Sequence, residues 1–110
     1  MHEAGLIAEA LTDALRRGPR GGDLARAPVA LEAVVTDPVR VSAAALGLHL
    51  EIALRQMGLA QVPVRIDVRG VACPTCGTAN RPDPGRPFCE ACGWPLPGQP
   101  GSGVRIKARW

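Results

Sequence analysis

Three segments of the chain alternate between apolar and other residues with a period of two. They cover residues 29–36, 62–68 and 104–110, and an apolar side chain recurs at every second position of each. This period is typical of a strand that buries one face. The third segment carries a basic row on its polar face, formed by Arg105, Lys107 and Arg109. We therefore predict three strands.

Two other segments have the longer period of a helix. Within residues 1–17 the apolar side chains recur at three- and four-residue spacing, at Leu6, Ile7, Ala10, Leu11, Ala14 and Leu15. A Gly-Pro pair is expected to end this amphipathic helix. A second helix is predicted over residues 43–57, with Ser42 as its N-cap and Gly58 at its end.

The second predicted helix is apolar around most of its circumference. Such a helix is either enclosed within the fold or presents a surface to a partner. His49 lies on it between two leucines, with no second His, Cys or carboxylate four residues away. We therefore expect His49 to be a locally hydrogen-bonded or partly exposed histidine and not a metal ligand.

All four cysteines of the chain belong to two Cys-x-x-Cys-Gly hooks. Cys73 and Cys76 form the first hook, Cys89 and Cys92 form the second, and twelve residues separate Cys76 from Cys89. Two such pairs predict tetrahedral Zn²⁺, because each hook supplies two sulfur ligands from one tight turn. The glycine that ends each hook is suited to a left-handed backbone conformation beside the metal.

Other interpretations of the hooks fit less well. Two disulfides would require an oxidising compartment, and the start of the chain has no signal-peptide pattern. A thioredoxin-like redox site needs one such motif, not a matched pair. A rubredoxin-type iron site has the same ligands, and spacing alone leaves it open. Four protein sulfurs fill the coordination sphere of zinc, so the predicted site is structural and not catalytic.

These elements together predict an α+β fold. We expect a small three-stranded sheet with two helices, plus an inserted four-cysteine zinc-ribbon lobe. The zinc-binding domain is assigned to residues 71–101, and residues 1–70 and 102–110 are assigned to an α/β domain, because the last strand returns to the first sheet.

The charge of the chain argues against a nucleic-acid partner. The formal net charge is +3. Four thiolates with one Zn²⁺ would bring the total near +1, and the charged side chains between the outer cysteines cancel. No apolar run approaches the roughly 20 residues of a membrane helix. We expect a cytoplasmic protein that binds neither nucleic acid nor membrane.

The first three residues, Met1-His2-Glu3, form a possible second metal site. The α-amine, the amide of His2 and the His2 imidazole can close two adjacent chelate rings on one cation. Three nitrogens in one plane suit square-planar Ni²⁺ or Cu²⁺ better than tetrahedral Zn²⁺. Amine and imidazole must be neutral, so binding should weaken as the pH falls through their pKa values, near ~8 and ~6.5.

In combination these features resemble the HypA/HybF family of nickel metallochaperones, which act in [NiFe]-hydrogenase maturation. The resemblance covers essentially the whole chain: the Met1-His2-Glu3 start, the layout of helices and strands, the two hooks and the final strand at residues 104–107. Within residues 41–52, similar residues stand at Val41, Ala45, Leu46, Glu51 and Ile52. The chain departs from the family at Ser42-Ala43-Ala44, where acidic residues and a proline are usual, and in the segments 18–28 and 94–101.

The resemblance implies a function and a set of partners. Nickel would bind at Met1, His2 and Glu3, and structural zinc at Cys73, Cys76, Cys89 and Cys92. The cargo would pass to the precursor of the hydrogenase large subunit, together with the nickel-loading GTPase of hydrogenase maturation. Some family members also serve urease maturation.

A function of another class is a zinc-ribbon module that binds nucleic acid or a transcription or translation factor. It rests on the hooks and on the basic row of the last strand. An enzyme is not expected, because the sequence has no open metal site with a second histidine, no Ser/His/Asp set and no phosphate-binding glycine motif.

Overall fold

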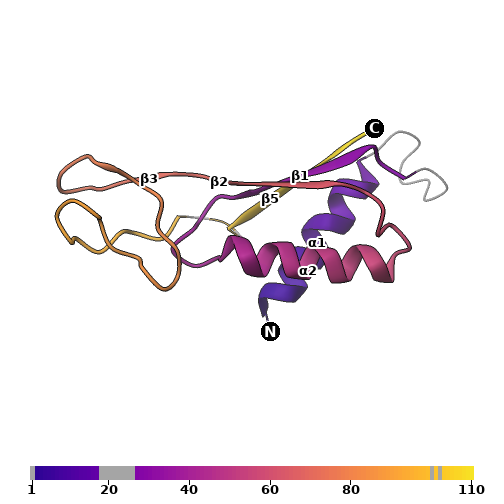
Figure 1. Ribbon diagram of the computed structural model, residues 1–110, viewed down its shortest axis with the longest axis horizontal. Coiled ribbons are helices and arrows are strands. Elements are labelled where there is room, and N and C mark those ends of the chain that lie inside the picture. Colours follow the sequence, from indigo (N-terminus) through magenta and orange to yellow (C-terminus); the bar gives the residue numbers. More distant parts are fainter. Residues whose placement is uncertain (1, 18–26, 100, 102) are drawn as a thin grey trace.

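Two helices and a three-stranded sheet form one end of the molecule, and the cysteine hooks form the other (Figure 1). This computed structural model describes residues 2–17, 27–99, 101 and 103–110, with the backbone alone at residues 2–4 and at Leu6. The molecule is elongated and measures 51 × 24 × 20 Å along its principal axes. The elements are α1 (His2–Arg16), β1 (Ala30–Val35), α2 (Ala43–Gln56), β2 (Val64–Val68), β3 (Val71–Ala72), β4 (Ala79–Asn80) and β5 (Val104–Arg109).

The main sheet has the strand order β2-β1-β5. Strand β1 pairs with β2 in parallel, which α2 makes possible by carrying the chain back to the starting edge of the sheet. Strand β5 pairs with β1 antiparallel after the chain returns from the hooks. The predicted α+β fold, with the cysteine lobe inserted before the last strand, is therefore confirmed.

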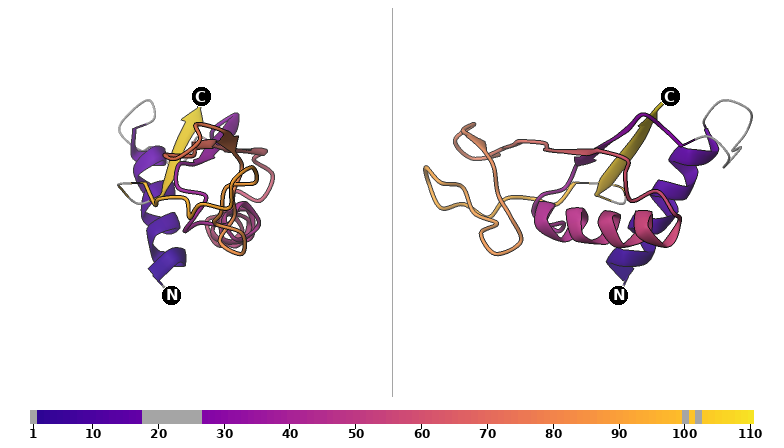
Figure 2. Two further views of the ribbon diagram at one scale, coloured as in Figure 1. Left: turned by 90° about the vertical axis from the view of Figure 1, so that its left-hand side faces the viewer. Right: turned by 45° about the vertical axis from the view of Figure 1, so that its right-hand side comes forward.

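Both helices lie on one face of this sheet (Figures 1 and 2). The strand residues that face them follow the predicted alternation, and Leu31, Ala33 and Val35 of β1 are fully buried. Ile7 and Leu11 of α1 fill the same core. Among the described residues no helix covers the opposite face, which carries the polar residues of the three strands.

Helix α2 has the predicted cap and two different apolar faces. The Ser42 hydroxyl accepts a hydrogen bond from the Ala45 amide at 3.3 Å. Three leucines, four residues apart, are buried against the sheet: Leu46, Leu50 and Leu54. Leu48 and Ile52 are 56% and 45% exposed. The helix is thus not enclosed, and part of its apolar surface faces solvent.

The cysteine lobe has its own small core. Strands β3 and β4 flank the first hook and pair antiparallel, and neither was predicted, because two residues carry no periodic signal. Val71, Cys73, Cys89 and Leu96 are buried together and belong to a cluster separate from the main core. No helix in the described ranges combines the length and apolar character that crossing a bilayer requires.

Candidate metal centre

The first hook is a tight turn closed by backbone hydrogen bonds. The amide of Cys73 donates to the carbonyl oxygen of Thr78 at 2.9 Å, and the amide of Gly77 donates to that of Cys73 at 2.9 Å. Gly77 has a φ of 77°, in the left-handed region where a glycine costs least. The turn brings Cys73 and Cys76 to the same side of the chain.

The second hook repeats this geometry. The amide of Cys89 donates to the carbonyl oxygen of Trp94 at 2.8 Å, and the amide of Gly93 donates to that of Cys89 at 2.9 Å. Gly93 has a φ of 76°. The predicted left-handed glycines are therefore confirmed at both hooks, and the two turns present their thiols in the same way.

The four thiols meet in one cluster. The sulfur atoms of Cys73 and Cys92 lie 3.6 Å apart, as do those of Cys76 and Cys89, and all four lie within 4.8 Å of one another. Sulfur ligands about 2.3 Å from one tetrahedral zinc would be separated by about 3.8 Å, whereas a disulfide bond is about 2 Å long. The residues predicted to bind zinc are thus assembled in a geometry that fits it.

Burial differs between the two members of each hook. Cys73 and Cys89 are 3% and 4% exposed, whereas Cys76 and Cys92 reach the surface. In both hooks the first sulfur is therefore packed in the lobe core, and the second closes the site from outside.

Backbone amides make the buried sulfurs good metal ligands. The Cys76 amide, aided by the Thr75 amide and neighbouring thiols, lowers the pKa of Cys73 against the opposing effect of burial. The Cys92 amide is the main cause that lowers the pKa of Cys89 to about 6. Amides that point at a sulfur stabilise its thiolate, which is the form that coordinates a metal.

The thiol of Cys92 holds its proton more strongly. The Trp94 amide lowers its pKa, but burial and hydrogen bonds with the other three thiols outweigh that effect and raise the pKa to about 12. Four sulfurs this close cannot all be anionic without a cation among them. Zn²⁺ would supply that charge, and its binding would release the remaining protons.

Asn80 joins the two hooks and was not identified from the sequence. It is 2% exposed, and its side-chain amide donates to the carbonyl oxygen of Thr78 at 2.9 Å. Its side-chain oxygen accepts a hydrogen bond from the Glu90 amide at 2.9 Å. The only sequence signal is a polar amide four residues after Cys76, which many loops contain.

A second unpredicted group fastens the lobe to the sheet. The carboxylate of Asp37 is fully buried and accepts a hydrogen bond from the guanidinium of Arg40. The same guanidinium donates to the carbonyl oxygens of Gln99 and Gly101, at 2.8 and 3.0 Å. Asp37 thus links the end of β1 to the segment that returns from the hooks.

The residues predicted to bind nickel are only partly described. Met1 lies outside the described residues, and so do the side chains of His2 and Glu3. The backbone of His2 and Glu3 forms the first turn of α1. His49 is half-buried on α2, and the four cysteines are the one potential metal-ligand cluster in the part of the chain where side chains are described.

Comparison with known proteins identified no relative. No protein-family model, no curated protein and no solved structure matches this chain.

Proposed function

We propose that this protein is a nickel metallochaperone of hydrogenase maturation, with a structural zinc lobe and a nickel site at its N-terminus. It would act as a carrier and not as an enzyme, and Ni²⁺ would be its cargo. The proposal places it in the cytoplasm, where thiols stay reduced. It requires a free amine on Met1.

The proposal rests on the difference between two sets of metal donors, the four cysteine sulfurs of the lobe and the nitrogen donors at the N-terminus. The four sulfurs lie within 4.8 Å of one another, and a zinc ion bound by all four would have no ligand position left for exchange. A cargo ion therefore needs another site, and Met1-His2-Glu3 offers nitrogen donors that suit Ni²⁺. The first amides of a helix have no intrahelical acceptor, so the position of His2 at the start of α1 leaves its amide available for metal binding.

Delivery would follow from the position of this site. A terminal site can pass its ion to an acceptor without unfolding the protein, whereas release from the sulfur cluster would disrupt the lobe core. The acceptor would be the precursor of the hydrogenase large subunit, loaded together with a GTPase of the same pathway, and urease maturation proteins are further candidates.

A nickel titration of the untagged protein tests this function. The zinc-loaded chain should bind one Ni²⁺ per protein with a square-planar absorption signature, and His2→Ala should abolish that binding. His49→Ala is the matched control, because it removes the other of the two histidines. Equal nickel binding by the wild type and His2→Ala would refute the N-terminal site, provided that zinc content is unchanged.

A second candidate function rests on exposed aromatic residues of the lobe. Phe88 and Trp94 are 54% and 52% exposed, and Arg86 is also at the surface. Exposed rings next to a cation are typical of surfaces that stack on bases. A zinc ribbon that binds single-stranded nucleic acid should lose most of its affinity in Phe88→Ala and Trp94→Ala, with no change in nickel binding.

A further inference from the structure

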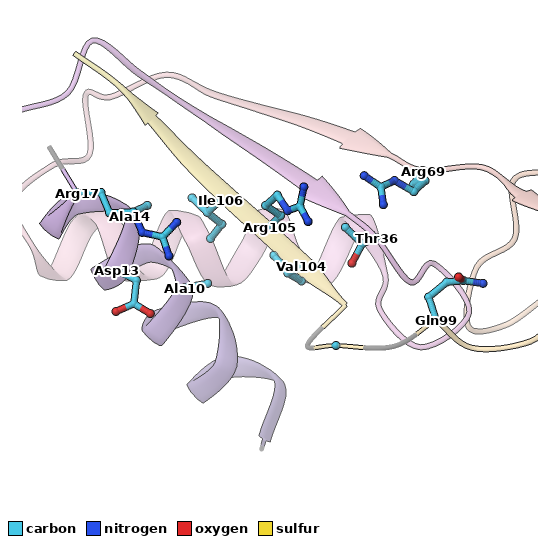
Figure 3. Close-up of a pocket in the computed structure, with 11 residues that line it drawn as sticks. Ala10, Asp13, Ala14, Arg17, Thr36, Arg69, Gln99, Val104, Arg105 and Ile106 are labelled. Carbon is cyan, nitrogen blue, oxygen red and sulfur yellow. The ribbon is translucent and has the colours of Figure 1, made fainter.

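A groove lined by three arginines lies between α1, the end of β1 and β5. Its volume is about 570 Å³, and its charged lining residues are Arg17, Arg69, Arg105 and Asp13 (Figure 3). The three arginines come from three places in the sequence: Arg17 directly follows α1, Arg69 directly follows β2, and Arg105 lies on β5. The fold therefore collects these positive charges in one hollow.

The register of the sheet explains how two of these arginines meet. Strands β2 and β5 flank β1, and Arg105 is paired with Val34 while Arg69 lies just past the pair of Val68 with Val35. Both side chains project from the sheet face that the helices leave open. Figure 3 shows their guanidinium groups directed toward each other, near Thr36 at the end of β1.

Two other arginines on this face already have ion-pair partners, whereas Lys107 adds a further positive charge to it. Arg65 pairs with Asp67 at 3.6 Å, and Arg109 pairs with Glu32 at 3.6 Å. Among the described residues, no carboxylate lies within ion-pair distance of Arg69 or Arg105. Two fork-shaped donors thus face the groove without an internal counter-charge, and carboxylates are their natural bidentate partners.

We propose that this groove docks an acidic segment of a partner protein, with Arg69 and Arg105 binding its carboxylates. The charged lining is exposed, which suits an extended chain better than an enclosed small molecule. The carboxylate of Asp13 in the groove, unpaired among the described residues, would repel a continuous phosphate backbone. None of the described residues that line the groove is aromatic, so none can stack on a base. The interaction does not depend on nickel.

The test measures fluorescence anisotropy of a labelled peptide of alternating glutamate and glycine, with the zinc-loaded full chain at about 150 mM salt. A peptide with glutamine in place of glutamate shows how much binding needs the carboxylates. The Arg69→Gln/Arg105→Gln variant should bind the acidic peptide about tenfold more weakly or worse. The matched variant, Arg81→Gln/Arg86→Gln, removes the same charge from the distant cysteine lobe and should stay within about twofold of wild type.

Three outcomes would overturn the proposal. Equal losses in both double variants would assign the binding to net charge alone. If the wild type does not bind the acidic peptide, the proposed docking site does not exist. Tighter binding of a single-stranded oligonucleotide of equal charge, lost in Arg69→Gln/Arg105→Gln, would assign the groove to nucleic acid instead. All four substituted arginines are exposed, so circular dichroism should show the same fold in both variants.

Discussion

The guanidinium of Arg40 lies 2.8 Å from the carbonyl oxygen of Gln99, a residue 59 positions further along the chain. This contact joins the end of the first strand to the segment that returns from the cysteine lobe. Two amides beside it, those of Thr36 and Asp37, donate to the carbonyl oxygen of Gly103 at 2.9 and 3.3 Å. The two connections are therefore held together at the junction between lobe and sheet.

Removal of this contact should destabilise the fold. In Arg40→Ala the buried carboxylate of Asp37 loses its one side-chain donor, and its other oxygen already has no partner in the described structure. We expect a loss of about 2 kcal/mol in the free energy of unfolding, measured by chemical denaturation.

The control for Arg40 is Arg55. It forms a 2.9 Å ion pair with Glu51 on α2, and both side chains are exposed, so Arg55→Ala should cost less than about 0.5 kcal/mol. A double variant, Asp37→Asn with Arg40→Ala, should be less destabilised than the sum of its single changes. Equal small losses in Arg40→Ala and Arg55→Ala would show that the junction contributes nothing.

Removal of zinc should unfold the lobe and spare the sheet. The lobe core and the main core share no buried residue among those described. The Cys76→Ser substitution, or removal of zinc by a chelator, should therefore disorder the lobe core and leave the main core folded. In an NMR spectrum, amide resonances of the hooks should collapse, while those of α2 and β1 stay dispersed.

The outcome that would contradict this prediction is loss of dispersion throughout the spectrum. It would mean that the sheet depends on the metal through the junction at Arg40. Re-addition of Zn²⁺ should restore the hook resonances of the chelated wild type but not those of Cys76→Ser, because three sulfurs leave the tetrahedral site incomplete.

Substitution of glycine by alanine should lower the stability of the protein in the hooks and raise it in α1. Gly77 and Gly93 have positive φ values of 77° and 76°, so Gly77→Ala and Gly93→Ala should each destabilise the lobe by about 1 kcal/mol. Gly5 lies on α1, and a Cβ there would meet no atom within 4 Å. Gly5→Ala should stabilise the protein by about 0.5–1 kcal/mol, because alanine favours a helix. Thermal unfolding of the zinc-loaded variants measures both effects, and a stabilising Gly77→Ala would contradict the hook geometry.

Periodicity was sufficient to predict the main elements. The strand around Ala33 and the helix around Leu50 each bury one face, so their apolar residues repeat with the period of the element. The sulfur ligands were predictable for a different reason, since few roles other than metal binding suit two matched Cys-x-x-Cys-Gly hooks.

Contacts between distant residues left no such pattern. Asp37 and Arg40 resemble any polar turn in the sequence, and their function depends on carbonyl oxygens brought back from positions 99 and 101. Likewise, the basic row on β5 was visible, but Arg69 joins it only because β2 and β5 flank the same strand. Tertiary register, which the local sequence does not encode, decides both arrangements.

Asn80 provides the sharpest test of how the hooks are held together. Its amide donates to one hook and its oxygen accepts from the other, so no alanine or aspartate can replace both bonds. Asn80→Ala would leave the Glu90 amide without its acceptor, and the side-chain bond that helps to lower the pKa of Cys89 would be lost. We expect faster zinc loss to a chelator, by about tenfold, because one buried hydrogen-bonded link is worth about 1–2 kcal/mol and such links typically change metal affinity 10–100-fold. Thr75→Ala is the control, since that side chain is exposed on the first hook and only its backbone amide points at Cys73. Equal zinc-release rates in Asn80→Ala and Thr75→Ala would show that the hooks are held by the sulfur cluster alone.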